Sequence, residues 1–180
     1  MNRSRALPLL AFTFIAFTGA ASAAETVAEF DGGIGSQPLR AEGLTNDVRG
    51  VDPGGRPWEI RRLKATVRND RRKGPTIVVR GEGLILGGGN SIGTAAAPRE
   101  VAATLFCGTD EAFNSASVQT TPSGDFVIKS PLASETGNMA LPEPCGTPAA
   151  PAILLIRNAP GGVPGAWFAA GIPKGLDHDD

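Results

Sequence analysis

The sequence predicts an all-β protein with antiparallel strands, and three observations support this class. Glycine and proline are frequent, with 24 and 15 of the 180 residues, which interrupts long helices and favours turns. Apolar and polar residues alternate in several short segments, as they do in half-buried strands. No segment keeps a 3.6-residue apolar period over several turns. We expect two packed sheets, an immunoglobulin-like β-sandwich in the broad sense, and a small β-barrel is the alternative.

The first 23 residues predict a secretory signal peptide. Arg3 and Arg5 precede an apolar run over residues 6–17, and the small residues 21–23 offer a cleavage site. The run is too short to cross a bilayer core of roughly 30 Å, so no transmembrane anchor is expected. We therefore expect residues 24–180 to form a single β domain of an exported protein, in the periplasm or outside the cell.

The longest alternating segment predicts a hairpin. Apolar residues alternate over residues 58–67 with Trp58 on the inner face, and their phase slips once at Arg61-Arg62, which predicts a β-bulge in this strand. Residues 69–75 combine Asn, Asp, Gly and Pro, which predicts a turn. Residues 76–80 then return as the second strand.

Further strands are expected along the rest of the mature chain. They lie at residues 27–31, 101–107, 117–121, 125–129, 153–158 and 166–172, with another near 37–44. Residues 122–124 predict the turn between the third and fourth of these. Residues 94–105 are ambiguous, because three alanines favour a helix whereas Pro98 would end it and the alternation from Val101 is that of a strand. Residues 153–156 are apolar on both faces, which predicts a central strand.

The two cysteines, Cys107 and Cys145, predict a disulfide. Export to an oxidising compartment and the even cysteine count both favour the bond. Neither cysteine has a neighbouring Cys, His or Lys that would indicate a metal site or a nucleophile. The segment between them is rich in proline, so we expect it to be poorly ordered and held by the bond.

Four segments resemble a group of small exported bacterial proteins that have no assigned activity. These segments are residues 83–90, 101–107, 154–158 and 167–172. The resemblance implies an exported β domain and supplies no functional motif.

The charge distribution is the most informative feature. Residues 56–80 contain nine basic residues against two acidic ones, whereas the rest of the mature chain is acidic. Alternation places Lys64 and Arg68 on the outer face of the hairpin and residues 71–73 at its tip, so that the hairpin could bind an anionic polysaccharide or lipid head groups. The alternative is an edge hairpin whose charges prevent aggregation. The candidate binding residues are Arg61, Arg62, Lys64, Arg68, Arg71, Arg72, Lys73 and Arg80.

Several partners and chemistries are not expected. Nucleic acid is one of them, because Trp58 is the only aromatic residue among these cations and points inward. No cofactor is expected, since the glycines of residues 81–93 lack the spacing of both nucleotide-binding loops. No metal site is expected either, because the carboxylates follow no metal-binding pattern.

One pentapeptide, residues 89–93, matches the Gly-x-Ser-x-Gly motif of serine hydrolases. The order Ser91, Asp125 and His178 also fits that class, but the motif needs a parallel sheet with crossover helices, and His178 lies in the terminal tail. We therefore expect no catalytic residue and predict a non-enzymatic binding or structural module. The alternative is a small secreted serine hydrolase that uses Ser91.

Overall fold

The computed structural model describes residues 24–41, 44–96, 99–137 and 139–175, and within them the chain is all-β. Every pairing between strands is antiparallel, and the one helical element of the described residues is a single 3-10 turn. The predicted fold class is confirmed. The elements are β1 (Glu25–Gly35), β2 (Arg40–Ala41), β3 (Leu44–Thr45), β4 (Trp58–Asp70), β5 (Gly74–Leu86), β6 (Glu100–Cys107), β7 (Ala112–Asn114), β8 (Val118–Gln119), β9 (Phe126–Pro131), β10 (Ala133–Ser134), β11 (Ala152–Asn158), the 3-10 turn (Pro160–Gly162) and β12 (Trp167–Pro173).

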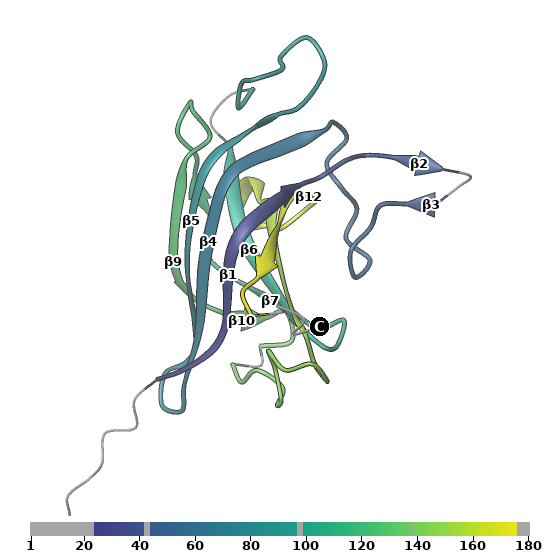
Figure 1. Ribbon diagram of the computed structural model, residues 1–180. Helices are drawn as coiled ribbons and strands as arrows, with labels where there is room; N and C mark the ends of the chain where they lie inside the picture. Colours follow the sequence, from purple (N-terminus) through teal and green to yellow (C-terminus); the bar gives the residue numbers. More distant parts are fainter. Residues whose placement is uncertain (1–23, 42–43, 97–98, 138, 176–180) are drawn as a thin grey trace, which may run out of the picture.

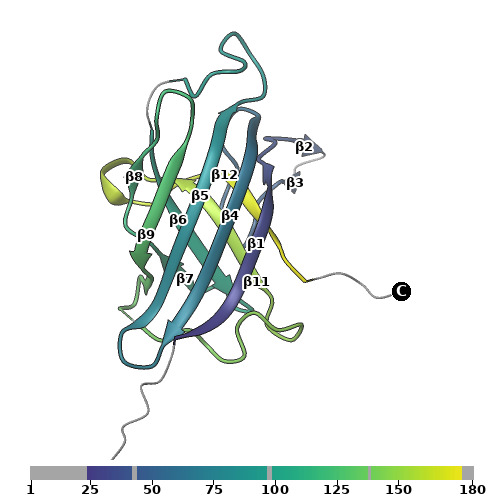
Figure 2. The same ribbon diagram turned by 60° about the vertical axis from the view of Figure 1, so that its left-hand side comes forward.

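Ten strands form one sheet that curls around a single core (Figures 1 and 2). The order is β10-β7-β6-β11-β12-β1-β4-β5-β9, with β8 also paired to β6. The two outermost strands, β9 and β10, are consecutive in the chain and are joined through the buried Leu132. The backbone N–H of Ala116 donates to Ser130 Oγ at 2.9 Å, which links the β7–β8 connection to β9. The sheet therefore nearly closes on itself, and its architecture is nearer to the barrel alternative than to two separate sheets.

The core fills the inside of this curled sheet. It is built from the inward residues of eight strands, β1, β4, β5, β6, β7, β9, β11 and β12. Its fully buried side chains include Leu63, Ile77, Leu84, Leu105, Phe113, Ile128, Leu154 and Ile156. This contiguous apolar interior provides most of the driving force for folding.

A second apolar cluster lies on the other face of the sheet. Phe106, Leu155 and Trp167 project from β6, β11 and β12, and the irregular chain before β4 covers them with Val48 and Val51. Strands β6 and β11 are therefore buried on both faces, which accounts for their nearly continuous apolar sequences. The predicted central position of residues 153–156 is confirmed, because β11 lies between β6 and β12.

The hairpin of β4 and β5 is longer and more symmetrical than predicted. The second strand runs to Leu86, and the pairing keeps one register from Trp58 opposite Leu86 to Asp70 opposite Gly74. In β4, the alternation of inward and outward side chains shifts by one residue at Arg61, as the sequence predicts. In β5, the same alternation shifts at the facing residue, Gly83, which has φ +65°. The expected one-strand bulge is thus wrong, because both strands change phase together and their register is preserved.

Several other predictions are confirmed in part, including the strand at residues 101–107, which is β6. The region near residues 37–44 supplies two short strands, β2 and β3, and residues 94–105 contain the strand β6 with no helix in their described part. Residues 122–124 do form a turn, but β8 and β9 on its two sides pair with different strands, β6 and β5. The segment between the cysteines is not irregular throughout, because it contains β7 to β10.

Two further predictions fall on the undescribed parts of the chain. The signal peptide, residues 1–23, and His178 lie outside the described residues. Among the residues that are described, no helix has the length and apolar character needed to cross a membrane.

Candidate functional site

The predicted basic hairpin lies in the middle of one side of the sheet. β4 is hydrogen-bonded between β1 and β5, and β5 between β4 and β9 (Figure 2). Neither strand is an edge strand. Protection of an exposed edge therefore does not explain why charges concentrate here.

Three of the eight candidate cations have a carboxylate partner. Arg61 and Arg62 share Glu82, with nitrogen to oxygen distances of 3.6 and 3.8 Å. Lys64 Nζ lies 3.1 Å from Asp31 Oδ2, across the β1–β4 pairing. All these side chains are exposed to solvent, so each pair contributes at most about 1 kcal/mol to folding.

The other five candidate cations form no ion pair with any described carboxylate. They are Arg68, Arg71, Arg72, Lys73 and Arg80, and all are exposed. Arg80 also lies directly opposite Lys64 in the β4–β5 ladder, and two like charges at such a position destabilise the sheet. The outer face and tip of the hairpin thus present five cations without an ion pair to a described carboxylate, although the charge of Asp70 attracts Arg72 and Lys73.

The tip of the hairpin is shaped by Asp70. Its Oδ1 accepts hydrogen bonds from the backbone N–H groups of Arg72, at 2.8 Å, and Lys73, at 3.2 Å. The N–H of Arg72 is the main cause that holds the pKa of Asp70 below its ordinary value. The aspartate closes the turn with its side chain, so that the three basic side chains of residues 71–73 all remain exposed.

A second aspartate supports the phase change of the hairpin. Asp125 Oδ1 accepts the backbone N–H of Gly83 at 2.8 Å, and its Oδ2 accepts the hydroxyl of Ser123 at 2.8 Å. The bond from Ser123 is the first cause that lowers the pKa of Asp125 from 3.8, followed by the bond from Gly83, and the charge of Arg61 adds to them. Asp125 thus accepts the N–H of Gly83, the residue at which the alternation of inward and outward side chains in β5 changes.

Replacing Asp125 by alanine should lower the free energy of unfolding at pH 7 by about 2 kcal/mol, because the N–H of Gly83 loses its acceptor. Since the pKa of Asp125 is lowered in the folded state, its charge stabilises the fold above about pH 4, and this contribution is lost as the pH falls through the folded-state pKa. The difference between parent and Asp125→Ala should therefore shrink from pH 7 to about pH 2. Urea denaturation at both pH values measures it.

The matched control is Asp125→Asn, which keeps an oxygen for Gly83 but cannot titrate. Its loss of stability at pH 7 should be smaller than that of the alanine variant, and its difference from that variant should not depend on pH. An alanine variant as stable as the parent at pH 7 would show that Asp125 does not support the hairpin.

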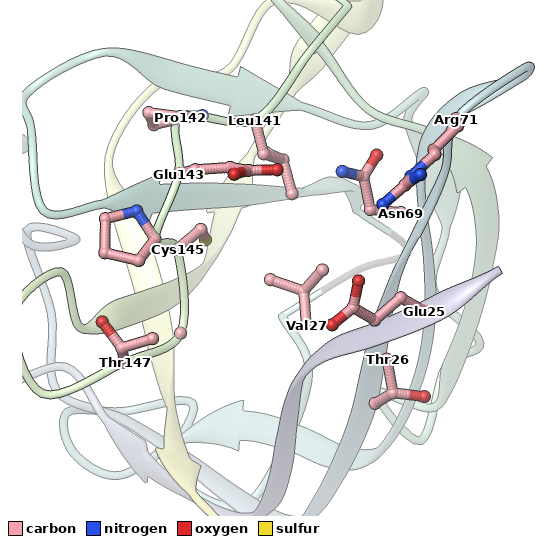
Figure 3. Close-up of a pocket in the computed structure, with 12 residues that line it drawn as sticks. Glu25, Thr26, Val27, Asn69, Arg71, Leu141, Pro142, Glu143, Cys145 and Thr147 are labelled. Carbon is pink, nitrogen blue, oxygen red and sulfur yellow. The ribbon is translucent and has the colours of Figure 1, made fainter.

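A pocket of about 460 Å³ opens beside the hairpin tip (Figure 3). Its walls come from the start of β1, from the hairpin through Asn69 and Arg71, and from residues 141–147, which follow β10. Figure 3 shows Arg71 and Asn69 on one side, near Glu25, with Glu143 and Cys145 across from them. Two carboxylates therefore face one guanidinium in this pocket, which makes it less suited to an anion than the exposed tip.

The disulfide builds one wall of this pocket. Cys107 at the end of β6 is bonded to Cys145, as predicted, with 4.9 Å between their Cα atoms. The next residue, Gly146, has φ +81° and packs so closely on the backbone carbonyl of Val27 that a Cβ atom would overlap it. The bond and this close approach together hold residues 141–147 against β1.

Ser91 lies at the other end of the β4–β5 ladder, in the turn after β5. It lines a separate pocket with Arg56 and Arg99, and no hydrogen bond from a described residue engages its hydroxyl. No described residue of that pocket is an acid or a histidine, and both carboxylate oxygens of Asp125 are occupied elsewhere. The described geometry therefore supplies Ser91 with neither a base nor an orienting acid.

Sequence reasoning missed the carboxylates that pair with the hairpin, and both pockets. Glu82 and Asp31 are isolated acids in the sequence, and only strand register brings them to Arg62 and Lys64. Within the described residues, no three side chains of His, Cys, Asp or Glu gather as a metal site would require. No family model, curated protein or solved structure matches the chain.

Proposed function

We propose that the chain is an exported, non-enzymatic module that binds an anionic polysaccharide through the basic hairpin. The exposure of Arg68, Arg71, Arg72, Lys73 and Arg80, none of which forms an ion pair with a described carboxylate, is the observation that carries this proposal. The signal-like N-terminus and the disulfide support export, since disulfides persist in oxidising compartments.

The position of these cations favours a binding role over a structural one. Arg68 and Arg80 stand on central strands, where no edge needs protection, residues 71–73 form the turn between these strands, and Arg80 faces Lys64 at a cost to the sheet. Arginine predominates, and its planar fork matches a carboxylate or sulfate group better than the ammonium of lysine does. Such a surface also attracts a polyanion before contact.

The shape of the charged strip favours a linear polymer over a lipid surface. The cations run from the tip of the hairpin at residues 71–73 along its outer face to Arg80, which is an elongated track. The tip residues carry no large apolar side chain that could insert among acyl chains. Lipid head groups are therefore the less favoured anionic partner.

Reversing two charges at the tip should abolish most of this binding. In Arg71→Glu/Arg72→Glu, affinity for heparin should fall about tenfold or more, because each exposed ion pair contributes up to about 1 kcal/mol and reversal replaces attraction with repulsion. Binding of the parent should weaken as salt rises, since the screening length falls from about 10 Å at 0.1 M to about 3 Å at 1 M. Heparin affinity chromatography and calorimetry measure both effects.

A matched control reverses two arginines in the chain before β4, Arg49→Glu/Arg56→Glu, which are not among the candidate binding residues, and gives the protein the same net charge. This control should retain most heparin affinity, and vesicles of phosphatidylglycerol should bind the parent more weakly than heparin does. An equal loss of heparin affinity in both variants would show that the effect comes from net charge alone and not from the hairpin. A parent without salt-dependent binding to heparin would overturn the proposal, and stronger binding to the vesicles would assign the hairpin to lipid head groups.

A further inference from the structure

The pocket that contains Ser91 lies at the opposite end of the β4–β5 ladder from the hairpin tip. β4 begins there with Trp58 and β5 ends there with Leu86, beside the loop at the top of Figure 1. The pocket has a volume of about 480 Å³, and ligand pockets usually hold between about 300 and 1,000 Å³. We call it the mouth pocket. Its lining includes Arg56, Trp58, Leu86, Ser91, Arg99 and Phe168.

Two stacked aromatic rings and an arginine form its innermost part. Trp58 and Phe168 stack with their ring centroids 4.1 Å apart, and both are buried. The guanidinium carbon of Arg99 lies 5.2 Å from the centroid of Trp58 and 5.8 Å from that of Phe168. A guanidinium at this distance is attracted by the ring faces, so that the rings fix its place in the pocket.

The backbone also holds Arg99 in place. Its N–H donates to Thr120 Oγ1 at 2.9 Å, and its carbonyl accepts the N–H of Thr120 at 2.8 Å. Of the side-chain nitrogens, Nε is buried and donates no hydrogen bond within the described structure. A buried N–H of a charged group that lacks an acceptor is costly, so that an acceptor brought near it by a bound molecule or water would stabilise this part of the pocket.

The rest of the lining is rich in donors and poor in acceptors. Arg56 is exposed at the rim and forms no ion pair with a described residue, and the hydroxyl of Ser91 is free to donate. None of the described lining residues is acidic, and the apolar side chains of Trp58, Leu86 and Phe168 are almost fully buried. A small anion matches this set of donors.

We propose that the mouth pocket binds a small organic carboxylate. The carboxylate would accept hydrogen bonds from Arg99 and Arg56. This site is distinct from the basic hairpin, both in its residues and in its place on the sheet.

The test uses 2-naphthoate and its neutral isostere 2-naphthamide, titrated into the mature protein and followed by calorimetry. The naphthoate should bind about tenfold more tightly or better, because only the anion can pair with the two guanidinium groups. Arg99→Gln should weaken naphthoate binding by a similar factor, and Arg56→Gln about threefold. Binding of naphthamide should change little in either variant.

Arg72→Gln at the hairpin tip is the matched control, because it removes one exposed positive charge far from the mouth pocket and should leave naphthoate affinity unchanged. If Arg99→Gln fails to fold, as circular dichroism would show, Arg56→Gln decides the test because its side chain is exposed. Equal affinity for acid and amide, an equal effect of Arg72→Gln, or no binding at millimolar naphthoate would overturn the proposal.

Discussion

Replacing Cys107 and Cys145 together by alanine is expected to lower the free energy of unfolding by about 4 kcal/mol. The bond joins residues 38 positions apart, and the chain-entropy model assigns about this value to a closed loop of that length. It also ties the end of β6, in the core, to the wall of the pocket beside the hairpin tip. Urea denaturation of parent and variant, followed by circular dichroism, measures the difference.

Chemical reduction of the parent is the control for this experiment. Cys107 is buried, so alanine removes packing as well as the bond, whereas a reductant breaks the bond and leaves both sulfur atoms in place. The reduced parent should lose most of the stability that the double variant loses. A thiol titration that finds two free thiols in the untreated, denatured parent would show that the bond does not form.

The sequence predicts best those strands that have one buried face and one face exposed to solvent. In β4, apolar residues alternate with charged ones, and this alternation identifies the inner face directly. β11 is also identified, for the opposite reason, because its continuous apolar run indicates burial on both sides. Prediction fails for β7 and β10, whose two or three residues are too few to show a period.

Strand order and closure could not be predicted, since they depend on pairing between segments far apart in the chain. β1 is the clearest example, because its first part pairs with β4 and its last part with β12. The register between β1 and β12 shifts between Phe30 and Gly33, and Gly32, with φ +105°, lies in this interval. The shift in alternation that β4 and β5 share has the same cause. The apolar pattern of β4 shows it in the sequence, but it also depends on Gly83 in β5, which only the pairing of the strands brings opposite Arg61.

Composition identified the hairpin as a charged site but not which of its charges are free. That distinction depends on carboxylates of neighbouring strands. The sequence does not indicate that Glu82 forms ion pairs with Arg61 and Arg62, whereas Arg80 forms no ion pair with a described carboxylate. The mouth pocket was missed for a related reason. Arg99 is a single basic residue within the ambiguous segment 94–105, and only the fold places it over Trp58 and Phe168.

Gly35→Ala is expected to lower the free energy of unfolding by about 3 kcal/mol. A Cβ atom at Gly35 would overlap the backbone carbonyl oxygen of Trp58 and lie 2.7 Å from the Cα atom of Glu59. This backbone cannot move away easily, because the N–H of Trp58 donates to the carbonyl of Ser36 at 2.8 Å and Trp58 pairs with Leu86 on the other side. The free energy of unfolding from urea denaturation checks the value.

The matched control is Gly55→Ala, in the chain just before β4. A Cβ atom there meets no other heavy atom within 4 Å, so alanine should leave the stability unchanged or raise it by up to about 1 kcal/mol, by reducing the freedom of the unfolded chain. The contrast separates the general effect of glycine replacement from the close approach of β1 to β4. Since Gly35 lies against the backbone of Trp58, its replacement should also weaken naphthoate binding in the mouth pocket. A Gly35→Ala variant as stable as Gly55→Ala would mean that the two strands do not approach as closely as the fold requires.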